Sequence, residues 1–470
     1  MHELILNKTK KRGYSLSNNI NQLRVLMARN EQLSLGAFIH PAGHHVAAWR
    51  HPDVAPDPLN IQQYIRIAQL AERACLDTLF IADSLAVFDS PVAHKMARSN
   101  YFEPVTLLAT LSAVTQHIGL IATATTSYNQ PYHIARQFAS LDHLSGGRAG
   151  WNLVTSDAAN EAANFNREQH FSHQERYLRA REFYRVVEGL WNSWEDDAFV
   201  YDKPGGEVYR PEKMHPLHHH GDYFRVRGPL NIARSPQGKP VVVQAGSSED
   251  GKALAAATAD VVFTAQPTLD KAKAFYRDVK QRLSLSGRTE DSLKIMPGVL
   301  LITGQSQSEA EEKYEQFQQL VEPDVGIALL GRMLGNFDLS GYPPDEPLPE
   351  LPLSDSGQQS RQALLLALAA EENLTLAELG LRIAGGRGHR TLKGTPRQIA
   401  DELQCWFEEY AADGFNIMVP HLPLGLEEVA LQVVPELQRR GLFRKQYQGN
   451  TLRSHLGLSV PAFSPSSARN

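Results

Sequence analysis

The feature that most limits how this chain can fold is a regular alternation of short apolar runs with helical segments. Residues 118–123 (IGLIAT) form an almost continuous apolar run, which is typical of a strand buried on both faces in a parallel sheet. Residues 131–142 follow helical spacing, with Pro131 in the first turn, and a Gly-Gly pair ends that segment. Residues 149–155 (AGWNLVT) predict the next strand, and Ser172 begins an S-x-x-E capping-box pattern that predicts another helix. The segment therefore reads strand, helix, strand, helix.

The same alternation continues along most of the chain. Eight strand candidates are found, at residues 33–39, 78–82, 118–123, 149–155, 240–245, 260–265, 295–303 and 414–419. Eight is the number of strands that closes a (β/α)₈ TIM barrel, so we expect this α/β fold, with a large insertion before the eighth strand. An open, doubly wound sheet is the alternative, because a count of strands does not establish closure.

The predicted domain organisation is one barrel with additions. The barrel occupies residues 32–448 and carries two insertions, at 195–239 and 321–394, while an N-terminal extension at 1–31 and a C-terminal tail at 449–470 flank it. Long loops in compact domains are usually functional or disordered, so both insertions are candidate lids over a site.

Composition excludes several classes of protein. The 47 Lys and Arg residues against 52 Asp and Glu give a net charge of −5 without a basic stripe, so no nucleic-acid partner is expected. No segment approaches the roughly 18 apolar residues of a membrane span, and no apolar stretch follows the basic N-terminus as in a secretory signal. Cys75 and Cys405 are too few for a disulfide framework, which favours a reducing, cytoplasmic location. The Walker A, G-x-G-x-x-G, H-E-x-x-H, G-x-S-x-G and C-x-x-C motifs are absent.

Polar residues follow several of the predicted strands. Asp83, Thr123 and Asn152 lie at or near strand ends, and Ser247 and Ser248 follow the fifth strand. In TIM barrels the residues at the carboxyl ends of the strands form the active site, so these side chains are candidate site residues. The alternative is that strand ends are polar simply because loops begin there.

Two helix starts have the features of anion sites. Ser247 and Ser248 precede a helix, so hydroxyls and free backbone N–H groups meet there at the positive end of a helix dipole. His173 and Tyr177 are four residues apart at the start of another helix and therefore share a face. A phosphate group is the predicted ligand; plain N-capping by the serines and ordinary packing by the other two are the alternatives.

Histidines are concentrated in two loops. His40, His44 and His45 follow the first predicted strand, where imidazoles are suited to acid–base chemistry near neutral pH. A second cluster lies at residues 215–220, and neither cluster has the cysteines or spaced carboxylates that complete a metal site, so no metal is predicted. Three basic residues, Arg50, His51 and Arg98, are candidate contacts for an acidic substrate; the alternative is that they are ordinary exposed basic residues.

Longer stretches of the chain match a known family. They include AWRHPD, DTLFIADS, TSYNQPYHIARQFASLDHLSGGRAGWNLVTS, SHQERYLRAREF, PVVVQAGSSEDG, GNFDLS and DGFNIMVP. With these stretches the chain resembles the bacterial-luciferase-like flavin-dependent monooxygenases. It most resembles the branch that includes the oxygenase component (component A) of nitrilotriacetate monooxygenase, pristinamycin IIA synthase, dibenzothiophene-sulfone monooxygenase and long-chain alkane monooxygenase. The resemblance runs from about residue 33 to 457.

The resemblance implies a fold, a reaction and a set of site residues. It implies a (β/α)₈ barrel that uses reduced FMN (FMNH₂), supplied by a separate NAD(P)H:FMN oxidoreductase, and O₂ to insert one oxygen atom into a small organic substrate. A homodimer or homotetramer is also implied. By motif position, the flavin ring would lie near Asp83, Thr123 and Asn152, the flavin phosphate near His173, Tyr177, Ser247 and Ser248, and His44 would serve the oxygen chemistry.

Other readings of the sequence remain open. A deazaflavin-dependent oxidoreductase would have the same fold without consuming O₂. A flavin-binding protein without catalysis, and a metal-dependent barrel hydrolase, are the further alternatives.

Overall fold

A computed structural model gives the fold, and it describes residue 29, residues 31–352 and residues 359–465. The predicted N-terminal extension lies almost wholly outside the described residues, as do the last five residues of the predicted tail. The barrel and its additions belong to one compact unit, Leu33–Asn470.

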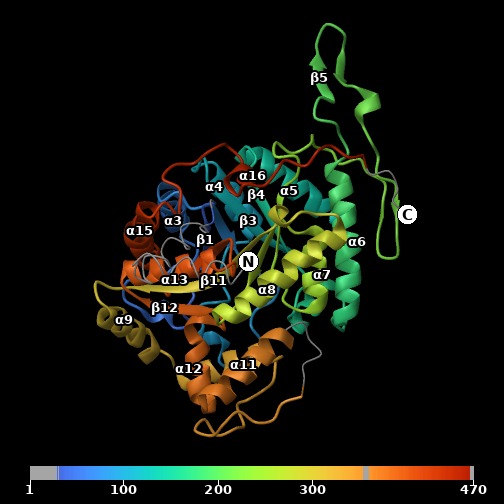
Figure 1. Cartoon of the computed structure of the whole chain (residues 1–470). Coiled ribbons are helices and arrows are strands. Elements are labelled where there is room, and N and C mark those ends of the chain that lie inside the picture. The colour runs from blue at the N-terminus through green and yellow to red at the C-terminus, as the bar shows by residue number, and fades with distance from the viewer. Residues whose placement is uncertain (1–28, 30, 353–358, 466–470) are drawn as a thin grey trace, which may run out of the picture. The chain divides into compact units, whose positions relative to one another are not determined.

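Within the described residues, eight parallel strands close into a barrel (Figure 1). They are β1 (Ser34–Ile39), β2 (Thr78–Ile81), β3 (Gly119–Thr125), β4 (Ala149–Val154), β9 (Val241–Gln244), β10 (Val261–Thr264), β11 (Lys294–Thr303) and β13 (Gly414–Met418). Each pairs with the next in this order, β10 pairs with β11, and β13 returns to β1 through Ser34 opposite Gly414. The prediction of a closed (β/α)₈ barrel is confirmed, and each strand overlaps its predicted range.

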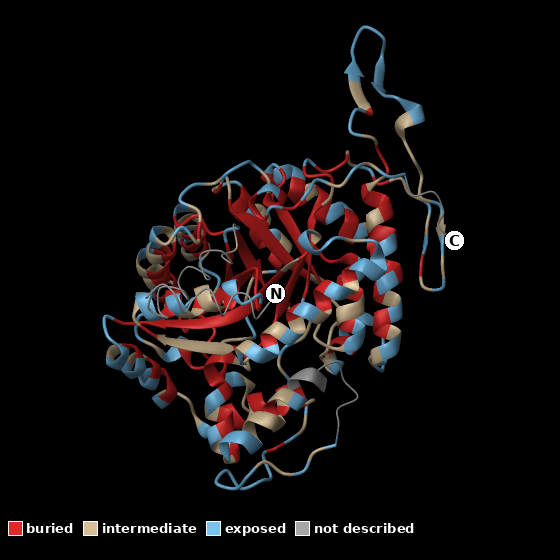
Figure 2. Ribbon diagram, viewed as in Figure 1, coloured by how far each residue is buried: buried red, intermediate tan, exposed pale blue. Residues whose placement is uncertain are grey.

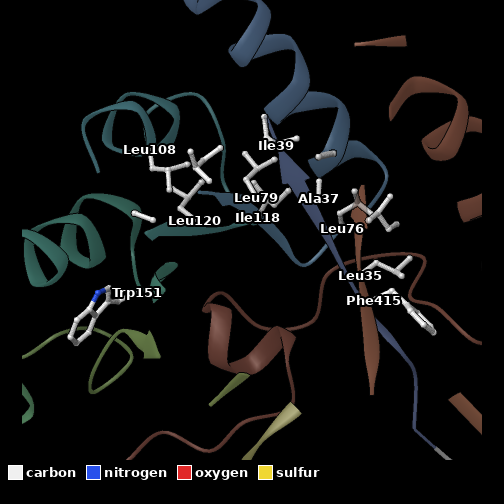
Figure 3. Close-up of a cluster of buried hydrophobic side chains, with 14 of the residues drawn as sticks. Leu35, Ala37, Ile39, Leu76, Leu79, Leu108, Ile118, Leu120, Trp151 and Phe415 are labelled. Atoms are coloured by element: carbon white, nitrogen blue, oxygen red, sulfur yellow. The ribbon is translucent and has the colours of Figure 1, made fainter. Parts of the chain in front are cut away.

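The strands read as continuous apolar runs because both of their faces are buried. In β1, Leu35 belongs to the cluster between strands and helices, while Phe38 points into the barrel with Phe80 and Ile121 of the next two strands. Figure 3 shows the outer cluster, in which Leu35 lies with other strand residues and with Phe415 of β13. Figure 2 shows that the strands form the buried centre of the molecule.

The helices that follow the strands surround the barrel, and their ends agree with the local sequence signals. They are α3 (Ile61–Arg73), α4 (Pro104–Ser112), α5 (Pro131–Ser145), α6 (His173–Trp191), α7 (Glu249–Thr258), α8 (Leu269–Leu283), α9 (Gln307–Gln319), α13 (Pro396–Glu408), α14 (Leu424–Glu428) and α15 (Val434–Arg439). Pro131 opens α5, Gly146 ends it in the left-handed region at φ 68°, and Ser172 caps α6 by accepting from the N–H of Glu175. Among the helices that the structure describes, none is both long and apolar enough to cross a bilayer.

The described residues of the insertion at 321–394 form mainly helices. It contains α10 (Pro323–Met333), α11 (Gln359–Glu372), α12 (Leu376–Gly386) and a strand, β12 (Arg390–Gly394), which pairs with the second half of β11. Apolar residues of α10 and α12 form their own buried cluster with Met96. The sequence predicts only an insertion here, and the structure adds a second small core.

The insertion at 195–239 contains two short hairpins. The first pairs β5 (Phe199–Asp202) with β6 (Glu207–Tyr209) and projects from the barrel in Figure 1; the second pairs β7 (His219–His220) with β8 (Arg225–Val226). The end of this insertion contacts the C-terminal segment, because Arg234 donates a hydrogen bond to the carbonyl of Pro461.

The C-terminal segment closes the amino-terminal end of the barrel. Helix α16 (Leu452–His455) places Leu452 in the interior cluster, where a Cβ added to Gly119 would lie 2.4 Å from it. Arg453 forms a two-armed ion pair with Asp260 at distances of 2.8 and 3.2 Å. The packed body therefore extends beyond residue 448, the predicted end of the barrel.

Candidate active site

Three connected compartments lie at the carboxyl ends of the strands. The central compartment, of about 320 Å³, is lined by residues that end β2, β3, β4 and β9. It shares Tyr177 and Gly246 with the serine compartment, of about 410 Å³, which also includes Ser247 and Ser248. On its other side it shares Asp83 with the arginine compartment, of about 180 Å³. This is the end of a TIM barrel at which active sites occur.

The serine compartment brings together the residues predicted to bind an anion. Ser248 caps α7 by accepting from the N–H of Gly251 at 3.1 Å, and its Oγ lies 3.4 Å from the Tyr177 hydroxyl. The rings of His173 and Tyr177 lie 4.8 Å apart, and His173 Nδ1 is 3.6 Å from Asp250. Burial, followed by the charge of Arg176, lowers the pKa of His173, so this imidazole is largely neutral near pH 7.

The turn before α7 packs tightly against the first turn of that helix. A Cβ on Gly246 would lie 2.8 Å from the backbone of Gly251, so only glycine allows the turn to fold this tightly against the helix. Ser247 Oγ lies 3.3 Å from the hydroxyl of Thr264, and Lys271 lines the far wall. Hydroxyls and two lysines, Lys252 and Lys271, therefore line one space at the start of α7, and Lys252 is paired there with Glu249 and Asp278.

The central compartment presents a chain of hydrogen bonds that ends in unpaired oxygens. Thr123 donates to the carbonyl of Ile81 at 2.8 Å, and Asn152 Nδ2 donates to Thr123 Oγ1 at 2.9 Å. Asn152 Oδ1 and Gln244 Oε1 are buried and, among the described residues, have no hydrogen-bond partner. A buried acceptor without a donor is costly, so these two amide oxygens are suited to ligand N–H groups.

Asp83 lies at the wall between the central and arginine compartments. Burial raises the pKa of its carboxyl to about 7. The charges of Glu103 and Glu161 also raise this pKa, whereas the hydrogen bond from Ser84 lowers it. A carboxyl with this pKa both accepts and releases a proton near neutral pH.

His44, the predicted residue for oxygen chemistry, is fully buried and does not line the three compartments. Its Nε2 lies 2.8 Å from the carbonyl of Phe38, so Nε2 carries the proton and donates. Its Nδ1 accepts from Arg387 Nη2 at 2.5 Å. Burial, followed by Arg387, holds the pKa of His44 well below its usual range. Of the three histidines in this loop, His40 is the one that lines a compartment.

Some functional candidates were not identified from sequence. Gln244 is the polar residue of an apolar strand, which is a signal that sequence reading can detect. Arg332 and Arg387 come from the insertion at 321–394 and meet Arg98 in the arginine compartment, a proximity that no spacing in the sequence shows.

His215, His219 and Trp151 make structural contacts away from the compartments. His215 lies 3.1 Å from Glu195 and His219 lies 3.0 Å from Glu182, outside the compartments. Trp151 is fully buried among the helices and donates to the carbonyl of Ala124.

Comparisons with known proteins show which family the chain belongs to. A family model described as luciferase-like monooxygenase matches residues 37–413. N-acetyl-S-(2-succino)cysteine monooxygenase from Bacillus subtilis (strain 168) is 50% identical over 438 residues, covering 93% of this chain and 99% of that protein. Nitrilotriacetate monooxygenase component A from Aminobacter aminovorans is 50% identical over 446 residues, covering 93% and 98%. A crystal structure of riboflavin lyase with modified FMN and riboflavin matches with a TM-score of 0.83 and 31% identity, covering 92% of this chain and 97% of that one.

The family model covers most of the barrel, and the two relatives span nearly the whole chain. The chain therefore belongs to the luciferase-like monooxygenase family and is a flavin-dependent monooxygenase.

Proposed function

We propose that this enzyme uses reduced FMN, delivered by a separate NAD(P)H:FMN oxidoreductase, to insert one atom of O₂ into a small organic substrate. The observation that carries the proposal is a single cleft with an anion site at one end and unpaired amide oxygens in its middle. A flavin mononucleotide has this order of groups, a phosphate joined to a ring that bears N–H donors.

The phosphate of FMN fits the serine compartment. Ser247, Ser248 and Tyr177 offer hydroxyl donors, and the N–H groups of the first turn of α7 point toward the same space. His173, whose ring lies tilted against that of Tyr177, would add a ring nitrogen. The tight turn at Gly246 supports this role, because it lets the backbone approach a ligand closely.

The ring of FMN fits the central compartment. Asn152 Oδ1 and Gln244 Oε1 would accept hydrogen bonds from ring N–H groups and so gain the partners that they lack. Thr123 holds Asn152 in place, and Phe38 and Phe80 supply an apolar floor.

The protein's part in the reaction follows from these positions. Reduced FMN, when bound, supplies two electrons to O₂, so that one oxygen atom enters the substrate and the other leaves as water. The buried floor of the central compartment excludes water from the reacting groups. Asp83 holds an exchangeable proton on its carboxyl at the wall shared with the arginine compartment, where a substrate would approach.

The partner and the location are part of the same proposal. The relative from Aminobacter aminovorans is called component A, which indicates a system of more than one protein. A cytoplasmic location is supported by Cys75 and Cys405, which do not form a disulfide.

Oxygen labelling tests the proposal. The protein is supplied with FMN, NADH, a separate FMN reductase and ¹⁸O₂, and offered nitrilotriacetate, N-acetyl-S-(2-succino)cysteine or dibenzothiophene sulfone. We expect at least one product to contain a single ¹⁸O atom by mass spectrometry, and no product when FMN is omitted. Turnover without O₂, label that comes from water, or the absence of both turnover and reduced-FMN binding would refute it.

A further inference from the structure

The arginine compartment gathers three positively charged side chains. Arg98, Arg332 and Arg387 line it together with His40, while Asp83 is half-buried on the wall toward the central compartment. These arginines come from three separate segments, the loop after β2, helix α10 and the end of α12. A shape that gathers three guanidinium groups into one cavity focuses a positive field there.

Two of the arginines lack carboxylate partners within the part of the chain that the structure describes. Arg98 donates from Nη2 to the carbonyl of His44 at 3.1 Å, and Arg332 lies over the ring of Phe88 at 5.2 Å. Neither forms an ion pair with a described residue. Burial lowers the pKa of Arg98 to about 10, and repulsion by the charge of Arg332 lowers it further toward that value. Both side chains are half-buried, and like charges gathered in one cavity favour the binding of a counter-charge.

The acidic residues in this wall do not supply that counter-charge in full. Asp83 and Asp157 are the carboxylates that line the compartment. The pKa of Asp83 is raised to about 7 by burial, so near neutral pH part of the Asp83 population is uncharged. Arg98 and Arg332 therefore remain without an ion-pair partner among the described residues.

His44 holds two of these arginines in place. Its Nδ1 accepts from Arg387 and its backbone carbonyl accepts from Arg98. Its Nε2–H is committed to the carbonyl of Phe38, so the ring has no free nitrogen for a substrate or for oxygen chemistry. The side chain fixes the direction of the Arg387 guanidinium from behind the cavity wall.

The backbone at Arg387 also points to a functional requirement. Arg387 ends α12 with φ 49°, in the left-handed region that glycine adopts more readily. The sequence places an arginine there although glycines stand on both sides, as Gly386 and Gly388. Strain retained at a non-glycine residue is found where the side chain serves a ligand or a switch.

We propose that the arginine compartment binds an organic substrate with two or more carboxylate groups, and that the His44 side chain is a positioning residue for Arg387, one of the arginines that hold it. The binding site follows from the arginines alone, while oxygenation of the bound substrate rests on the proposed function above. Arginine matches carboxylate in a two-armed geometry, so separate guanidinium groups select for separate carboxylates. The shared wall at Asp83 places such a substrate beside the central compartment.

Anaerobic calorimetry with the full-length protein and reduced FMN tests the substrate class. The probes are nitrilotriacetate and N-acetyl-S-(2-succino)cysteine, which carry several carboxylates, and dibenzothiophene sulfone, which is uncharged. We expect at least one polycarboxylate to bind, and Arg332→Gln and Arg98→Gln to weaken that binding at least about tenfold. The matched control is Arg382→Gln, because Arg382 belongs to the same insertion as Arg332 but pairs with Glu372 and does not line this compartment. The affinity of this control for the polycarboxylate should stay within twofold of wild type.

The affinity for reduced FMN is measured in the same variants, which separates this proposal from the previous one. Normal reduced-FMN binding with unchanged polycarboxylate affinity in both variants would overturn the arginine site. The arginine site would also be overturned if only the sulfone bound, or if none of the three probes bound. Failure to bind reduced FMN in the wild type would instead refute the proposed function.

A His44→Leu variant tests the positioning role. If His44 only orients Arg387, the variant should weaken polycarboxylate binding at least about fivefold and raise KM, while kcat at saturating substrate stays within about twofold. A large loss of kcat with unchanged substrate affinity would show that His44 acts in the chemistry, and would overturn its assignment as a positioning residue. Unchanged KM and kcat would overturn it equally.

Discussion

A Ser248→Asp variant is expected to lose about a hundredfold in affinity for reduced FMN while keeping its fold. Aspartate is as good an N-cap as serine, so the bond to the N–H of Gly251 that starts α7 is retained. The new carboxylate, however, faces the space in which the proposed phosphate lies. Two like charges about 4 Å apart repel by about 4 kcal/mol at an effective dielectric constant of 20, and partial screening leaves about 3 kcal/mol. Each 1.4 kcal/mol corresponds to a tenfold change in affinity.

Anaerobic fluorescence titration with reduced FMN measures this effect, and thermal unfolding checks the fold. Ser306→Asp is the matched control, because Ser306 caps α9 by accepting from the N–H of Glu309 and does not line a compartment. We expect this control to bind reduced FMN as the wild type does. If Ser248→Asp bound reduced FMN within threefold of the wild-type affinity, the assignment of the phosphate to the serine compartment would be wrong.

An Arg453→Met variant is expected to lose about 3–5 kcal/mol of unfolding free energy at pH 7, because it leaves Asp260 buried without its partner. Arg453 and Asp260 are 2% and 7% exposed, and Arg453 also donates from Nε to the carbonyl of Lys239. The pair anchors the segment that carries Leu452 into the end of the barrel. Urea unfolding followed by circular dichroism measures the loss.

The loss of unfolding free energy in Arg453→Met should become smaller as the pH falls. Burial alone would raise the pKa of Asp260, but Arg453 and Lys239 outweigh it and hold this pKa below the usual value. The pair therefore stabilises the wild type above about pH 4, and the effect fades as pH falls through the lowered pKa. In the variant the pKa of Asp260 rises, so the difference from wild type should be larger at pH 7 than at pH 4. Arg439→Met, which breaks an exposed pair with Glu436, should change stability little. Equal losses in the two variants would contradict the role of the buried pair.

The barrel could be predicted because its signals are local. Strands such as β3 are apolar on both faces, and the helices between them begin and end at residues with clear capping roles, such as Pro131, Gly146 and Ser172. Strand β12 was missed because its sequence, RTLKG, is charged and only half-buried, and so lacks the apolar run that marks the other strands.

The candidate site was predictable in part. Spacing shows that His173 and Tyr177 share a helix face, and the helix start shows that Ser248 is a cap, but only the closed barrel brings Tyr177 to 3.4 Å from Ser248. The arginine compartment could not be predicted, because it forms where an insertion folds back over the strand ends. The two predicted lids also differ: residues of 321–394 line the compartments, whereas none of the described lining residues comes from 195–239.

The most direct test of the central claim is the affinity of the wild-type protein for reduced FMN compared with reduced riboflavin, measured anaerobically. The two ligands share a ring and differ in the phosphate. If the serine compartment binds that phosphate, reduced FMN should bind at least about tenfold more tightly, since hydrogen bonds to a charged group contribute about 1.5–3 kcal/mol. Equal affinity for the two ligands, or binding of neither, would contradict a flavin mononucleotide site at the mouth of this barrel.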